Sequence, residues 1–125
     1  MSNLSIMVVE DEEELRENLT DLLEFKGHAV TSCSDGEQAV AQFERVNPQL
    51  VLLDIQLPGI NGLEVLRTIK AQNRNTPVVI VSASSAPSVI QEAKSAGAYK
   101  IILKPYDHND ILRVIDEITA SGANE

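Results

Sequence analysis

The run Leu50–Leu53, LVLL, followed at once by Asp54, is the stretch that decides the fold. A short apolar run with no alternating polar residue is typical of a strand buried on both faces, as in a parallel sheet. Similar short runs recur along the chain, two of them weaker and rich in β-branched residues. They are Leu4–Val9, Ala29–Cys33, Val78–Val81 and Lys100–Leu103. We therefore predict five strands.

Between these runs, apolar residues recur three or four positions apart, which is the period of an amphipathic helix. The helical patterns cover Leu15–Leu23, Ala39–Val46, Leu63–Ile69, Pro87–Ala96 and Ile111–Ile118. Gly27, Pro48 and Gly97 follow three of these patterns, as residues that end helices often do. Five strand–helix pairs in series predict an α/β fold, a doubly wound five-stranded parallel sheet with helices on both faces.

Length and composition limit the class of protein. The 125 residues are enough for one domain, which we expect to span 1–125, with a core at 4–119 and a disordered tail at 120–125. The chain has no apolar run long enough for a transmembrane helix, and its acidic beginning argues against a signal peptide. One cysteine, Cys33, excludes an internal disulfide, and two separated histidines do not make a zinc site. The formal net charge of −9 argues against direct binding of nucleic acid or anionic membrane. These features together predict a soluble protein of a reducing compartment, the cytoplasm.

Polar side chains stand where the predicted strands end. Glu10 and Asp11 follow the first strand, Asp54 ends the third, Ser82 follows the fourth and Lys104 follows the fifth. Open α/β sheets bind ligands outside the carboxyl ends of their strands, where the strand order reverses. We therefore expect these five side chains to converge on one rim of the sheet.

Carboxylates that converge on one rim of the sheet need a group that offsets their negative charge. Two of them about 4 Å apart repel by roughly 4 kcal/mol at an effective dielectric near 20, so a proton or a cation must lie between them. Oxygen ligands without histidine favour a hard ion, Mg²⁺ first and then Mn²⁺ or Ca²⁺. A carboxylate can also act as a nucleophile and form an aspartyl phosphate. Lys104 and the Ser82 hydroxyl are suited to contact phosphoryl oxygens.

Four motifs in order carry a family resemblance: VVEDE at Val8–Glu12, LLDIQLPGING at Leu52–Gly62, VIVSA at Val79–Ala83 and LKPY at Leu103–Tyr106. With these motifs the chain resembles the receiver domain of bacterial two-component response regulators, over residues 4 to 119. The resemblance implies a flavodoxin-like, CheY-like fold. It also implies a switching module with slow self-dephosphorylation rather than an enzyme.

The resemblance implies a role for each acid. Asp54 would accept a phosphoryl group from the phosphohistidine of a sensor histidine kinase or phosphotransfer protein. Mg²⁺ would be held by Glu10, Asp11, Asp54 and the backbone carbonyl of Gln56. The acids that follow, at 12–14, are interpreted instead as favourable charges at a helix N-terminus.

The resemblance also implies a switch. Lys104 would bind the phosphoryl group, the Lys104–Pro105 peptide bond would be cis, and the Ser82 hydroxyl would move toward the phosphoryl group. In the family an aromatic residue of the fifth strand then turns inward, but here Ile101 occupies that position. The expected output face is the fourth helix, fifth strand and fifth helix, which would contact an effector domain, an output partner or a second copy on phosphorylation.

Three alternatives remain beside this reading. A pseudo-receiver would bind partners without phosphorylation, and Ile101 is the feature that favours it. A phosphatase with an Asp nucleophile usually has a second Asp two residues on, where this chain has Gln56. A flavin-binding module would need a phosphate loop rich in Ser, Thr or Gly after the first strand, where this chain has Glu10 and Asp11.

Overall fold

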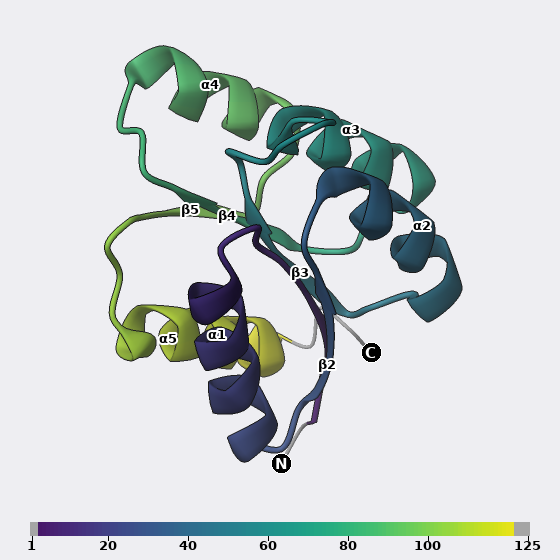
Figure 1. Ribbon diagram of the computed structural model, residues 1–125, viewed down its shortest axis with the longest axis vertical. Helices are drawn as coiled ribbons and strands as arrows, with labels where there is room; N and C mark the ends of the chain where they lie inside the picture. The colour runs from purple at the N-terminus through teal and green to yellow at the C-terminus, as the bar shows by residue number, and fades with distance from the viewer. Residues whose placement is uncertain (1–2, 122–125) are drawn as a thin grey trace.

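The computed structural model describes residues 3–121, and in this part of the chain five strands alternate with five helices (Figure 1). The elements are β1 (Ser5–Val9), α1 (Glu13–Phe25), β2 (Ala29–Cys33), α2 (Gly36–Val46), β3 (Leu50–Asp54), α3 (Gly62–Gln72), β4 (Val78–Ser82), α4 (Pro87–Ser95), β5 (Lys100–Leu103) and α5 (His108–Ser121). None of these helices is long and apolar enough to cross a membrane.

The strands form one parallel sheet in the order β2-β1-β3-β4-β5. The chain leaves β1 toward β2 on one side and returns to place β3 on the other side. Val9 pairs with Leu53, so the carboxyl ends of β1 and β3 are neighbours at this reversal point. The predicted doubly wound fold is confirmed.

The position of each strand in the sheet explains the strength of its sequence signal. In the central strands β3 and β4 every residue is buried, and in β1 all but the first residue is. The edge strands β2 and β5 each have one neighbouring strand and keep several residues partly or fully exposed. This exposure is why the runs at 29–33 and 100–103 are the weaker ones.

The sheet lies between two helical layers, with α1 and α5 on one face and α2, α3 and α4 on the other (Figure 1). Side chains of a strand alternate between the two faces. Val51 and Leu53 accordingly pack in the core beneath α2 and α3, whereas Leu50 and Leu52 pack in the core beneath α1 and α5. Cys33 is buried in the first of these cores, and burial raises the pKa of its thiol to about 11.

The helices differ in whether a side chain caps their first turn. Asp35 is the N-cap of α2 and accepts a hydrogen bond from the Gln38 backbone N–H. The N-cap of α1 is Glu12, which makes no side-chain cap, and two further acids lie in the first turn. Helix α5 continues to Ser121, two residues beyond the predicted core, because buried Ile118 still anchors its last turns. The rest of the predicted tail, 122–125, lies outside the described residues.

Candidate functional site

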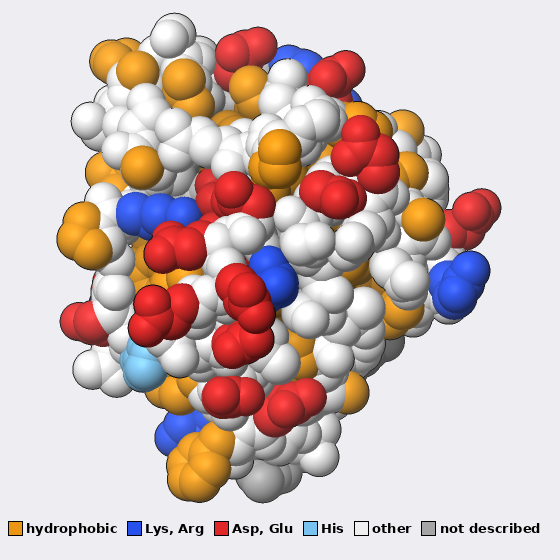
Figure 2. Space-filling model, viewed as in Figure 1, with side chains coloured by type: hydrophobic (Ala, Val, Ile, Leu, Met, Phe, Trp, Pro, Cys, Tyr) orange, Lys and Arg blue, Asp and Glu red, His pale blue; other side chains and the backbone are white. Residues whose placement is uncertain are grey.

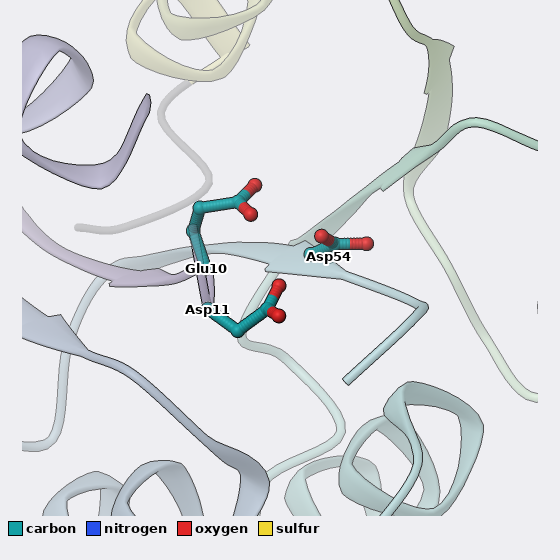
Figure 3. Close-up of side chains that lie close together, drawn as sticks. All are labelled: Glu10, Asp11 and Asp54. Carbon is teal, nitrogen blue, oxygen red and sulfur yellow. The ribbon is translucent and has the colours of Figure 1, made fainter. Parts of the chain in front are cut away.

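Three carboxylates meet at the carboxyl edge of the sheet. Glu10 and Asp11 project from consecutive positions after β1, and Asp54 projects from the end of β3 (Figure 3). One carboxylate oxygen from each lies within 4.8 Å of the others. Glu10 and Asp54 are only 4% and 3% exposed, whereas Asp11 is exposed. The structure therefore brings together these three of the five side chains that were expected to converge.

Lys104 lies between the two buried acids. Its Nζ donates to Glu10 Oε1 at 3.1 Å and to Asp54 Oδ2 at 3.0 Å. Burial by itself lowers the pKa of Lys104, but the hydrogen bonds to Asp54 and Glu10 outweigh it and hold that pKa above its usual value. The pKa of Glu10 is also raised, chiefly by burial and in addition by the nearby charge of Asp54. The ammonium is thus one cation that offsets the repulsion between these carboxylates.

The remaining oxygens of the buried acids contact the backbone. Asp54 Oδ1 accepts from the Gln56 N–H at 2.9 Å, and Glu10 Oε2 accepts from the Glu12 N–H at 3.1 Å. Each buried carboxylate is therefore fixed at one oxygen by the backbone and at the other by Lys104. The Lys104–Pro105 peptide bond that follows β5 is cis, the isomer that the resemblance implies.

The donor set fits a hard divalent cation. All three groups offer carboxylate oxygens, and within residues 3–121 no histidine or cysteine joins them. Exposed Asp11 leaves the cluster open to solvent. Acidic side chains also gather over α1 and toward the middle of the face drawn in Figure 2, which raises the local concentration of cations. The residues present therefore fit Mg²⁺.

Ser82 ends β4 and is 1% exposed. Its hydroxyl donates to the Ser84 carbonyl at 3.1 Å and accepts from the Ser84 N–H at 3.0 Å. The side chain of Gln56 accepts a hydrogen bond from the Ala83 N–H at 3.3 Å, which connects the loops after β3 and β4. The Ser82 hydroxyl thus makes both of its hydrogen bonds within its own loop.

Ile101 lies in the middle of β5 and packs partly buried against the core beneath α2, α3 and α4. The two nearby tyrosines lie elsewhere: Tyr99 is 44% exposed before the strand, and Tyr106 packs against the opposite core. Burial, with a further contribution from the charge of Glu10, raises the pKa of Tyr106. An aliphatic side chain therefore occupies the place where the family pattern has an aromatic one.

Two contacts were not predicted from the sequence. Arg16 of α1 turns back and donates through Nη1 to the Glu10 carbonyl at 2.9 Å. His28, in the loop before β2, is half-buried and accepts a hydrogen bond at Nδ1 from the Leu4 N–H at 3.1 Å. His108, at the start of α5, is exposed.

Comparison with known proteins agrees with the fold. A family model described as the response regulator receiver domain matches residues 6–116. The match covers most of the chain, and the chain belongs to this family of two-component signalling domains. Among curated proteins, it is 34% identical over 120 residues to sensory transduction protein RegX3 of Mycolicibacterium smegmatis, with 96% of this chain and 52% of that protein covered.

Another curated relative is of similar size. Sporulation initiation phosphotransferase F of Bacillus subtilis is 33% identical over 111 residues, with 89% of this chain and 90% of that protein covered. Several of the other matched relatives are longer, and the chain spans about half the length of the RegX3 proteins. Receiver domains of this family therefore occur both alone and joined to further sequence.

Solved structures place the fold in the same group. A CheY-like response regulator receiver domain protein from Methanospirillum hungatei superposes with a TM-score of 0.89 at 27% identity, with 93% of each chain covered. NtrX from Brucella abortus superposes with a TM-score of 0.86 at 32% identity, with 93% of this chain and 26% of that chain covered. The recognition of a CheY-like receiver is confirmed.

Proposed function

We propose that Asp54 is the phosphoacceptor, and that its donor is the phosphohistidine of a sensor histidine kinase or of a phosphotransfer protein. The observation that carries this proposal is the environment of the Asp54 carboxylate. It is 3% exposed at the rim of the sheet and held at its two oxygens by Gln56 and Lys104. A carboxylate fixed in this way is oriented for attack before the donor arrives.

The transfer is an in-line displacement at phosphorus. An Asp54 carboxylate oxygen forms the new P–O bond while the P–N bond to the donor histidine breaks, and the ring nitrogen keeps the electron pair. Lys104, already within 3.0 Å of Asp54 Oδ2, offsets negative charge on the phosphoryl oxygens as they approach. The product is an aspartyl phosphate.

Mg²⁺ fits the acidic cluster, with Glu10, Asp11, Asp54 and the backbone carbonyl of Gln56 as the residues that would hold it. Bound there, the ion would offset the charge of the carboxylates and phosphoryl oxygens together. The support from this chain is the set of oxygen donors and the exposure of Asp11. Because Lys104 contacts two of the same carboxylates, part of its interaction with them is exchanged when a cation binds.

The signal leaves through Ser82 and the output face, defined here as α4, β5 and α5. The phosphoryl group replaces the single negative charge of the Asp54 carboxylate with about −1.5 to −2, and this charge attracts the Ser82 hydroxyl away from Ser84. Two neutral hydrogen bonds, worth about 1 kcal/mol each, are then exchanged for a stronger one to a charged group. Helix α4 is the element that follows most easily, because Ala93 is its one fully buried residue.

The partners follow from this scheme. A groove of about 330 Å³ between β5 and α5 lies on the output face and suits an output partner, an effector domain or a second copy in a phosphorylation-dependent homodimer. Ile101 lines this groove. In this chain the signal would therefore pass an aliphatic side chain, and not an aromatic one, at that position. We place the proposed function in the cytoplasm, and the formal net charge of −9 argues against direct contact with nucleic acid or anionic membrane.

The test is intact mass after incubation with acetyl phosphate and Mg²⁺. We expect the gain of one phosphoryl group, lost in Asp54→Asn and in the presence of EDTA. Asp35→Asn, which changes an acid outside the site, is the matched control and should still be phosphorylated. If a folded, Mg²⁺-binding protein gains no phosphoryl group, the chain acts instead as a pseudo-receiver, a phosphorylation-independent interaction module.

A further inference from the structure

The loop between β1 and α1 carries two of the three acids, and the helix that follows it lacks a side-chain cap. The N-caps of α2 and α3 are Asp35 and Asn61, and each of these side chains accepts a hydrogen bond from the first turn. The N-cap of α1 is Glu12, whose side chain makes no such bond. The direction in which Glu10 and Asp11 point is therefore not set by a helix cap.

Arg16 supplies a restraint from inside the helix. From the first turns of α1 its Nη1 reaches back over the loop and donates to the Glu10 carbonyl at 2.9 Å, with a longer contact of 3.4 Å to the Asp11 carbonyl. These are the backbone groups of the two consecutive acids of the cluster. A planar, permanently charged guanidinium can hold two neighbouring carbonyls with one nitrogen in a fixed position.

We propose that Arg16 is a positioning residue for the cation site, which rests on the proposed function. By holding the Glu10 and Asp11 carbonyls, Arg16 fixes the loop so that both carboxylates and Asp54 offer oxygens within 4.8 Å of one another. Arg16 touches neither the phosphoryl group nor the cation in this scheme. It acts through the backbone of the residues that do.

The charge of Arg16 and its proposed positioning role predict opposite changes in Mg²⁺ affinity when Arg16 is replaced. A binding measurement can therefore distinguish them. A guanidinium beside acids repels a cation, so if charge were its only effect, removal of Arg16 would strengthen Mg²⁺ binding. If Arg16 positions the ligands, its removal weakens Mg²⁺ binding in spite of the lost repulsion. Loss of groups that orient metal ligands commonly costs tenfold or more in affinity.

The measurement is the Mg²⁺ dissociation constant by isothermal titration calorimetry, on the full chain without phosphoryl donor. We compare the wild type with Arg16→Gln, which removes the charge, and Arg16→Lys, which keeps the charge but loses the planar group. Arg67→Gln is the matched control, because Arg67 is an exposed arginine of α3 that pairs with Glu92. Backbone amide spectra and thermal unfolding confirm that each variant is folded.

We expect about tenfold weaker binding for Arg16→Gln, a smaller loss for Arg16→Lys, and a change of less than about twofold for Arg67→Gln. If Arg16→Gln does not fold, a weaker Mg²⁺ affinity of folded Arg16→Lys still supports the proposal. Equal or tighter binding in the folded Arg16 variants overturns the positioning role while the proposed function stands. Absence of Mg²⁺ binding in the wild type overturns both.

Discussion

At the scale of single residues, Lys104 joins groups that are far apart in the chain. Its ammonium contacts Glu10 and Asp54, which are 94 and 50 positions away in sequence. These contacts use two of the carboxylates that are suited to hold a cation. In the proposed function Lys104 therefore competes with Mg²⁺ for the acids, although both positive charges would stabilise the phosphoryl group.

We predict that Lys104→Met separates these two effects. Mg²⁺ affinity should rise by about tenfold, because a positive charge about 3 Å from two ligands is removed, while phosphorylation by acetyl phosphate slows by at least tenfold. Calorimetry gives the first quantity and intact mass over time gives the second. Lys100→Met, which removes an exposed lysine paired with Glu117, is the control. A weaker Mg²⁺ affinity in Lys104→Met would contradict the competition.

His28 is a second residue whose role is set by its surroundings. Its Nδ1 accepts the Leu4 N–H, which requires an unprotonated Nδ1. Burial lowers the pKa of His28 in the folded protein below its usual value, in spite of the charge of Asp116. The unfolded chain therefore takes up this proton first as the pH falls.

The predicted consequence is a loss of stability in acid. The contribution of His28 is fully present above about pH 6.5, the unfolded pKa of histidine, and is lost as the pH falls toward the lower folded pKa. His28→Asn keeps an acceptor and removes the titration. Between pH 7.5 and 5.5, urea unfolding in EDTA should show a larger fall in unfolding free energy for the wild type than for His28→Asn. Parallel pH profiles would show that His28 is not linked to folding.

At the scale of elements, the loop after β3 is held by close backbone contact. A Cβ added at Gly62, the first residue of α3, would lie 2.4 Å from Ile55 Cα and 2.7 Å from the Asp54 carbonyl. A Cβ added at Gly36 of α2 would lie 2.6 Å from the Ile60 carbonyl. The starts of two helices thus press directly on the segment that follows Asp54, the proposed phosphoacceptor.

Gly62→Ala tests this contact, because the change in the free energy of unfolding has opposite signs with and without the contact. In an unobstructed helix the change would stabilise the fold by up to about 1 kcal/mol. Here we predict a destabilisation of about 1–3 kcal/mol, because the chain must move to admit the methyl group. We also predict slower phosphorylation, since Asp54 is part of the displaced segment. Chemical denaturation gives the stability, and an unchanged or increased value would contradict the close contact.

The elements themselves were largely predictable because their signals are local. Apolar runs and helical periods identified each strand and helix to within a few residues. Contacts such as those of Arg16 and His28 were not predictable, because no spacing in the sequence shows where a long side chain turns. The helical state of Ala120 and Ser121 was also missed, since helix ends depend on packing of the last turn.

At the scale of the whole molecule, the strand order brings the acids together. Residues that follow separate strands were expected to converge because parallel strands end on the same rim. The order β2-β1-β3-β4-β5 makes β1 and β3 neighbours, and so brings Glu10 and Asp11 beside Asp54. The hydrogen-bond partners of the site residues in the unphosphorylated protein were not predictable in the same way. The Ser82 hydroxyl forms hydrogen bonds with the Ser84 backbone, because the conformation of the loop after β4 brings these groups together.

The most direct test of the central claim is to locate the phosphoryl group chemically. Borohydride reduces an aspartyl phosphate to homoserine, so the modified position can be read by peptide mass after treatment with acetyl phosphate and Mg²⁺. The account predicts homoserine at position 54, and at that position alone, with none when EDTA replaces the metal. Reduction at Glu10 or Asp11, or no reduced residue in a phosphorylated sample, would contradict the assignment of Asp54 as the phosphoacceptor.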